Sequence, residues 1–396
     1  IGVGLVGSEM CIRDSQCASA VTTGDSNIVL GKSAALVMTT GNQNIIIGQD
    51  AGAALTTQDT CIFIGHDAGK SVNNNAANGS IFIGYEAGDG ATAGASNVGI
   101  GYQSLSGTMA ANASYNTAVG HQAGKALAGN SNSNVAIGTF ALDAAAENDR
   151  NTVIGYGAMG AADDGEDGNV VIGYSAMANA NNAANDYNVI IGYEAGTGGN
   201  GGAMSYNVAI GNLALNSTDT ATVNEIVAIG REACTAVTSG DANGTVAIGG
   251  FALGELTSGQ ANTAVGWAAM YNGMDIGDFN TAVGYQALYA LNPGSDGHGS
   301  NTAVGYRAGY NQTTAENNTF MGARAGEDVT GASNVIIGRE AALDGTSINH
   351  NVIIGASAGS NASMTGDTNI FIGSSAGDAN TNGTNNIVIG GGSDGG

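Results

Sequence analysis

The sequence predicts an all-β protein, a parallel β-solenoid or β-roll of about 21 coils with roughly 18 residues in each. One observation is a motif of asparagine, three apolar residues and glycine that recurs 21 times, with successive glycines 16 to 21 residues apart. A second is the composition of the triplets, which are rich in valine and isoleucine and bounded by asparagine and glycine, as in short strands. So regular a period is typical of units that stack along one axis.

Each copy contains three residues to which we assign a structural role. The asparagine begins the strand, the glycine turns the corner after it, and an alanine three residues later packs closely. In three well-defined copies these residues are Asn188, Gly192 and Ala195, then Asn280, Gly284 and Ala287, then Asn301, Gly305 and Ala308.

The triplets are apolar on both faces. Their first and third residues share one face, and the second residue points to the other. The second residue is never polar, being alanine in eight copies and otherwise valine, isoleucine, phenylalanine or, once, Gly99. A lone solenoid would expose one face to water, so the pattern predicts that this face is covered. A homotrimer around a common axis is the simplest cover, and a monomer with two sheets packed inside each coil is the alternative.

The asparagine that begins the strand occurs in 17 of the 21 copies and is replaced by Cys61, Ser80, Ile226 and Thr245. Side-chain amides stacked about 4.8 Å apart can bond to one another and to the backbone of the turns. We therefore expect a structural ladder of amides in preference to a row of amides that bind a ligand.

The chain is expected to contain one repeat domain, residues 27–396, preceded by a lead-in at residues 17–26. Residues 1–16 do not fit the repeat and there is no initiator methionine. The segment 6–15 resembles translated sequencing-adapter sequence, so we interpret residues 1–16 as an artefact and exclude them from the fold prediction. The chain is then expected to be an internal fragment of a longer protein.

Composition and charge restrict the partners. The chain has 67 glycines, one proline and 5% aromatic residues, which suits a narrow core of short side chains. The net charge of −24, from 33 acidic and 9 basic residues, repels nucleic acid and anionic membranes. The sequence contains no apolar run long enough to predict a membrane-spanning helix. The four cysteines have neither metal-ligand spacing nor the density of a disulfide scaffold.

Few residues suggest chemistry. The acidic residues Asp163, Asp164, Glu166 and Asp167 are a weak candidate for Ca²⁺, but their spacing matches no calcium loop and a solvated acidic loop is favoured. His66 and His121 share the position after the corner glycine with seven tyrosines, which favours a turn position that tolerates rings over a metal site. No nucleophile, base and acid can be grouped, so we expect no enzyme activity and no cofactor.

Several copies carry a resemblance to a known class of repeat. The segments 262–270, 280–288 and 301–309 resemble repeats of tail-fibre-domain proteins of phages and bacteria. Residues 207–214 are similar, more loosely, to head repeats of trimeric autotransporter adhesins. The resemblance covers about residues 27–390 and implies a left-handed, trimeric β-roll used as a fibre or adhesive head. The longer period than in adhesin heads implies larger loops, and neither a C-terminal chaperone domain nor a membrane anchor is present in the sequence.

The leading hypothesis is an extracellular structural fibre or adhesion module that presents loops or a tip to a host-surface glycan or protein. A phage tail fibre in the virion is the first choice, and the head of a bacterial trimeric surface adhesin is the second. The alternative from another class is a solenoid that binds ice or mineral. Its support is threonine at the first triplet position, at Thr117, Thr152, Thr263, Thr281, Thr302 and Thr319.

Overall fold

The structure, a computed structural model, divides the chain into two compact units, Ile1–Ser205 and Tyr206–Gly396. It describes residues 10–12, 16–74, 77–110, 113–144, 147–162, 165–179, 181–198, 202–218, 221–273, 277–292, 299–360, 364–378 and 382–392.

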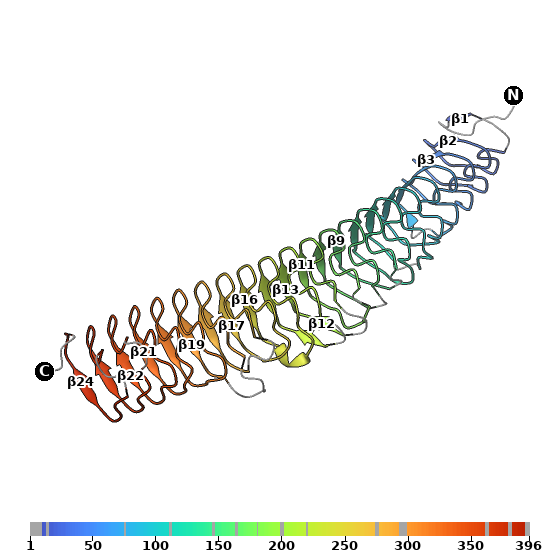
Figure 1. Cartoon of the computed structure of the whole chain (residues 1–396). Helices are drawn as coiled ribbons and strands as arrows, with labels where there is room; N and C mark the ends of the chain where they lie inside the picture. Colours follow the sequence, from blue (N-terminus) through green and yellow to red (C-terminus); the bar gives the residue numbers. More distant parts are fainter. Residues whose placement is uncertain are drawn as a thin grey trace. The chain divides into compact units, whose positions relative to one another are not determined.

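The first unit is a stack of coils in which each coil contributes one three-residue strand, and the two-residue β12 is an additional strand in the last of them (Figure 1). Its strands are β1 (Met10–Ile12), β2 (Ile28–Leu30), β3 (Ile45–Ile47), β4 (Ile62–Ile64), β5 (Ile81–Ile83), β6 (Val98–Ile100), β7 (Thr117–Val119), β8 (Val135–Ile137), β9 (Thr152–Ile154), β10 (Val170–Ile172), β11 (Val189–Ile191) and β12 (Met204–Ser205). From β1 to β11 each strand pairs in parallel with the next.

The second unit repeats this arrangement. Its elements are β13 (Val208–Ile210), β14 (Val223–Asn224), β15 (Val227–Ile229), the 3₁₀ helix η2 (Gly240–Ala242), β16 (Val246–Ile248), β17 (Thr263–Val265), β18 (Thr281–Val283), β19 (Thr302–Val304), β20 (Thr319–Met321), β21 (Val335–Ile337), β22 (Val352–Ile354), β23 (Ile370–Ile372) and β24 (Ile387–Ile389). β13 pairs in parallel with β15, and each later strand pairs with its successor.

Equivalent residues of successive coils face each other throughout both ladders. Val171 of β10 lies opposite Ile190 of β11, and Ala264 of β17 lies opposite Ala282 of β18. The prediction of a parallel β-solenoid is therefore confirmed. Part of the segment that does not match the motif also joins the sheet, because β1 pairs in parallel with β2. Its origin as adapter sequence stays a prediction.

The corner glycines are required by both backbone conformation and space. In the described coils their φ angles lie between 131° and 148°, a region that other residues rarely adopt. A Cβ atom added at Gly155 would lie 2.1 Å from the carbonyl oxygen of Gly173, and one at Gly284 would lie 2.3 Å from that of Gly305. Because successive coils approach so closely at this corner, no side chain fits there.

The core is a narrow column filled by two positions of each coil. One is the middle strand residue, which is buried in every described coil from β2 to β23, and the other follows the corner glycine by four residues. Where the strand supplies Phe82, the second position is Gly88, and an added Cβ there would lie 2.4 Å from the Phe82 ring. Where the strand supplies only Ala282, the second position is the fully buried Leu288. The two positions therefore share one volume.

Candidate binding surface

A column of partly exposed aromatic rings runs along the first unit, mostly at the position after the corner glycine. Tyr85 and Tyr102 stack with ring centroids 5.3 Å apart and an interplanar angle of 7°, and Tyr174 and Tyr193 repeat this geometry. The members of this tyrosine column are His66, Tyr85, Tyr102, His121, Phe140, Tyr156, Tyr174 and Tyr193. About half of each tyrosine side chain is exposed.

The stacking decides which part of each ring faces solvent. Phe140 meets His121 and Tyr156 edge to face. The other neighbouring rings of the tyrosine column cover one another's faces, so their edges and hydroxyl groups are left at the surface. A hydrogen bond to Glu86 raises the pKa of the Tyr85 hydroxyl, and one to Glu194 raises the pKa of the Tyr193 hydroxyl. The column therefore offers a polar rim on an apolar body.

The second unit has two shorter aromatic columns. One contains Trp267, Tyr285 and Tyr306, and the other contains Tyr271, Tyr289 and Tyr310. A hollow lies beside them, lined by Phe251, Trp267, Ala268, Tyr271 and Tyr289. We refer to this hollow as the aromatic hollow.

The aromatic hollow has a cation at its edge. The guanidinium carbon of Arg231 lies 4.3 Å from the centroid of the Phe251 ring, within the range of a cation–π contact. Phe251 also meets Trp267 and Tyr271 edge to face, at centroid distances of 5.9 and 5.8 Å. These rings form a concave apolar surface of the kind that contacts a sugar ring or an apolar side chain.

The strands present an apolar face to the outside. In β10 the middle residue Val171 is fully buried, whereas Val170 and Ile172 are half-buried. In β8 and β20 the outward third residues, Ile137 and Met321, are 38% and 44% exposed. Each described coil has one triplet strand in the main sheet, and only the coils of β11 and β13 contain a further strand, the two-residue β12 and β14, so a second sheet does not run through the described coils. The strands therefore have the apolar outer face that the sequence predicts. The described residues do not adopt the alternative in which two sheets pack inside each coil.

The asparagine ladder expected from the sequence is present. Asn188 donates from its backbone N–H and its side-chain Nδ2 to Oδ1 of Asn169, at 2.9 and 3.0 Å, and Nδ2 also donates to the Met204 carbonyl at 2.7 Å. In the second unit Asn301 bonds Oδ1 of Asn280 in the same way, at 3.0 and 3.1 Å. These amides are fully buried and bonded within the fold, so they serve structure and not ligand binding.

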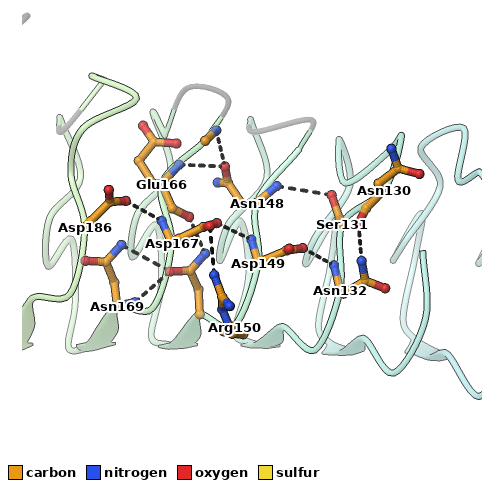
Figure 2. A network of polar contacts seen from close by, with 12 residues as sticks. Asn130, Ser131, Asn132, Asn148, Asp149, Arg150, Glu166, Asp167, Asn169 and Asp186 are labelled. Atoms are coloured by element: carbon orange, nitrogen blue, oxygen red, sulfur yellow. Dashed lines mark hydrogen bonds and ion pairs between the residues drawn. The ribbon is translucent and has the colours of Figure 1, made fainter. Parts of the chain in front are cut away.

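A second ladder lies two residues before the first, and sequence reasoning missed it. Asp149, Asp167 and Asp186 each accept a bond at Oδ1 from the backbone N–H of the preceding coil, at 2.6, 2.8 and 2.8 Å (Figure 2). Its direction is opposite to that of the asparagine ladder, whose oxygens accept from the following coil. The recurrence of Asp, Asn or Ser at this position was the available signal, for example at Asp25, Asn42, Asp59, Asn78, Ser114 and Asn132.

This second ladder bears on the acidic cluster considered for Ca²⁺. Asp163 and Asp164 lie outside the described residues. Glu166 is fully buried, and its carbonyl accepts a bond from Nδ2 of Asn151 at 2.7 Å. Asp167 uses one carboxylate oxygen in the ladder and places the other 3.0 Å from the guanidinium of Arg150 (Figure 2). Both Asp167 oxygens are therefore bonded within the protein, which leaves the cluster a weak calcium candidate.

The remaining residues with possible chemistry are two free cysteines and two histidines. Cys61 and Cys234 are free and buried, and burial raises the pKa of their thiols to about 11 and about 12. His66 and His121 lie in the tyrosine column, as their position predicted, but the structure also brings His66 beside two aspartates. Sequence reasoning did not predict that grouping, because one of the aspartates belongs to the preceding coil.

No protein-family model, curated protein or solved structure matches this chain. In the part of the chain that the structure describes, no helix is long and apolar enough to cross a membrane. The resemblance to tail-fibre and adhesin repeats stays a prediction.

Proposed function

We propose that the chain is a structural fibre or adhesion module, a left-handed homotrimeric solenoid that holds a binding surface away from its base. The observation that carries the proposal is the apolar outer face of the strands, repeated in coil after coil. Burying the exposed part of one valine or isoleucine is worth roughly 1 kcal/mol. Over ten coils, two such residues per coil supply on the order of 20 kcal/mol, an amount that favours a permanent partner.

A second and third copy of the chain are the partners that fit this face. The face is periodic, with equivalent residues of successive coils in register, and another copy has the same period. A partner with a different repeat would lose this match after a few coils. Closed rotational symmetry then places the apolar faces around one axis, which removes them all from water.

The receptor-binding part of the proposal rests on the aromatic surfaces. The aromatic hollow offers apolar rings with an arginine nearby, which suits a host-surface glycan or an exposed protein side chain. The net charge of −24 disfavours nucleic acid and anionic lipid as receptors. A phage tail fibre in the virion is our first assignment and a bacterial surface adhesin head the second, so the proposed location is extracellular in either case.

Oligomeric state and shape test this proposal together. Light scattering of the full chain should give a mass three times the 38.7 kDa of one chain, and electron micrographs should show rods. Val170→Glu places a charge on the outer face and should dissociate the assembly, whereas Arg150→Glu on the neighbouring turn should leave it intact. A monomeric wild type at micromolar concentration would remove the trimer, and compact globules would remove the fibre.

One observation favours the ice- or mineral-binding alternative. Thr263, Thr281, Thr302 and Thr319 occupy the first positions of four successive strands in register, β17 to β20. However, the third positions of these strands are valine or methionine, so only one threonine row forms. Thermal hysteresis of a purified sample tests this function directly, and we expect none.

A further inference from the structure

Three ligating side chains from two successive coils of the first unit converge just after β3 and β4. They are Asp50, His66 and Asp67, each of which offers one ligand atom, and these atoms lie within 4.8 Å of one another. Asp50 and Asp67 occupy the same position of their coils, two residues after the corner glycine, with φ angles of 55° and 58°. The backbone N–H of Asp67 bonds the Gln49 carbonyl at 3.0 Å, so the coil backbone fixes the separation of the group.

Two atoms of this group, one on the buried Asp67 and one on the His66 ring, which is 41% exposed, are themselves buried without a hydrogen bond in the described part of the chain. Only 8% of Asp67 is exposed, and its Oδ1 is buried with no hydrogen-bond partner in the described part of the chain. His66 Nδ1 is also buried without a hydrogen bond there, 3.2 Å from Oδ2 of Asp67. A buried carboxylate oxygen left unpaired is costly, and a cation held between these atoms would remove that cost.

The surroundings of the group are negative. The carboxylates of Asp50, Asp67 and Asp89 all act on the one ammonium group of Lys70. Lys70 Nζ lies 3.4 Å from Oδ2 of Asp67 and is the group's own counter-ion. Its side chain is 46% exposed and flexible, so a stronger cation can displace it into solvent.

We propose that Asp50, His66 and Asp67 bind a divalent transition-metal ion of the Zn²⁺ class. One imidazole nitrogen and two carboxylate oxygens suit such an ion and leave a fourth position for water. Ca²⁺ is disfavoured, because it takes six to eight oxygen ligands. The ion would join two successive coils within a single chain, so the site does not depend on the proposed trimer or on its receptor.

The same unit contains a natural control. His121 occupies the position of His66 three coils later, in the same column of rings. Its neighbours at the aspartate position are Gln103 and Gln122, which bond each other through Nε2 and Oε1 at 2.6 Å. His121 therefore stacks on a tyrosine of the neighbouring coil, as His66 does, but it lacks the carboxylates, and it should not bind the ion.

The first experiment is a calorimetric titration of the full chain with Zn²⁺. We expect one tight site per chain, weakened at least about tenfold in His66→Gln and in Asp67→Asn, since each removes a ligand. His121→Gln should bind as the wild type does, and Lys70→Met should bind more tightly because the competing charge is gone. Equal affinities in the wild type and Asp67→Asn, or an equal loss in His121→Gln, would overturn the proposal.

A second experiment uses the wild type alone and so does not depend on the folding of any variant. Diethylpyrocarbonate modifies exposed imidazoles, and mass spectrometry gives the rate at each histidine. Zn²⁺ should slow the modification of His66 and leave that of His121 unchanged, and Ca²⁺ at the same concentration should protect neither. If Zn²⁺ leaves the rate at His66 unchanged, the site does not exist.

Discussion

The coils of β4 and β5 and the coils of β9 and β10 belong to one unit, yet they fill the same interior with different side chains. The middle strand residues of β4 and β5 are phenylalanines, and the later core position of each coil is glycine. In the coils of β9 and β10 the strands supply valine and the later position supplies the fully buried Met159 and Met177. The φ angles at that position are 64° for Gly88 and 51° for Met177.

The comparison shows that the two kinds of coil have the same backbone conformation at the later core position. It also shows that this position and the middle strand residue fill one common volume. A methionine at positive φ costs about 1 to 2 kcal/mol of backbone strain. Burial of its side chain gains about 1.5 to 3 kcal/mol, which offsets the strain only when the strand leaves room. In the coil of β5 the ring of Phe82 occupies that room, so glycine is the residue that fits.

The largest effect is expected when only one of the two core positions of a coil is changed to the residue that the other coils have there. Gly88→Met keeps an allowed backbone, as Met177 demonstrates, but its side chain would collide with the Phe82 ring, 2.4 Å from the new Cβ. We expect a local destabilisation of about 3 kcal/mol from overpacking. Hydrogen exchange of the amides in β5 measures this local free energy of opening.

The matched double variant tests whether the two positions are coupled. Phe82→Val combined with Gly88→Met copies the pair formed by Val171 and Met177 in the coil of β10. Most of the stability lost in Gly88→Met should return, which corresponds to a coupling energy of at least about 2 kcal/mol once the cost of Phe82→Val alone is included. If the two substitutions are simply additive, the positions do not share a volume and the comparison fails.

The same two regions differ at the head of the strand. Asn169 continues the ladder, accepting two bonds from Asn188 at 2.9 and 3.0 Å. Ser80 breaks it, because its hydroxyl accepts one long bond of 3.3 Å from the Asn97 N–H. We expect Asn169→Ala to cost about 2 kcal/mol, since it leaves buried donors unpaired, and Ser80→Ala to cost about half as much. Equal losses in chemical denaturation would mean that the ladder adds nothing beyond a single bond.

Much of this could be predicted from the sequence. The period, the triplet strands, the corner glycines and the asparagine ladder all depend on one residue type at one position. Three features were missed because they join residues of different positions or different coils. These are the exchange of volume between Phe82 and Gly88, the reversed ladder through Asp167, and the approach of Asp50 to His66. The first needs the depth to which each side chain fills the interior of one coil, and the second needs the direction in which the aspartate side chain points. The third needs the spatial offset between coils, which varying loop lengths conceal in the sequence.

A smaller, favourable effect is expected from repairing the ladder where it is broken. The Cys61 sulfur lies 3.6 Å from the Ala77 carbonyl, which corresponds to the acceptor of the side-chain amide in other coils. Cys61→Asn would donate to that carbonyl and bond Oδ1 of Asn44, which already accepts the backbone N–H of residue 61 at 2.9 Å. A gain of about 1 kcal/mol is expected in denaturant unfolding. Cys61→Ser is the control and should not be stabilising, and a loss in Cys61→Asn would show that the coils of β4 and β5 cannot accept an amide.

The smallest expected effect is the modification of Cys61 by a thiol reagent, which should scarcely occur in the native chain. Desolvation raises the pKa of the Cys61 thiol to about 11, because burial disfavours the thiolate. At about pH 8 roughly one thiol in a thousand is then ionised, and that thiolate is also shielded from the reagent. A thiol reagent should therefore leave Cys61 of the native chain unmodified, and modify it readily in denaturant. Rapid native modification would mean that the coil of β4 opens at its strand head.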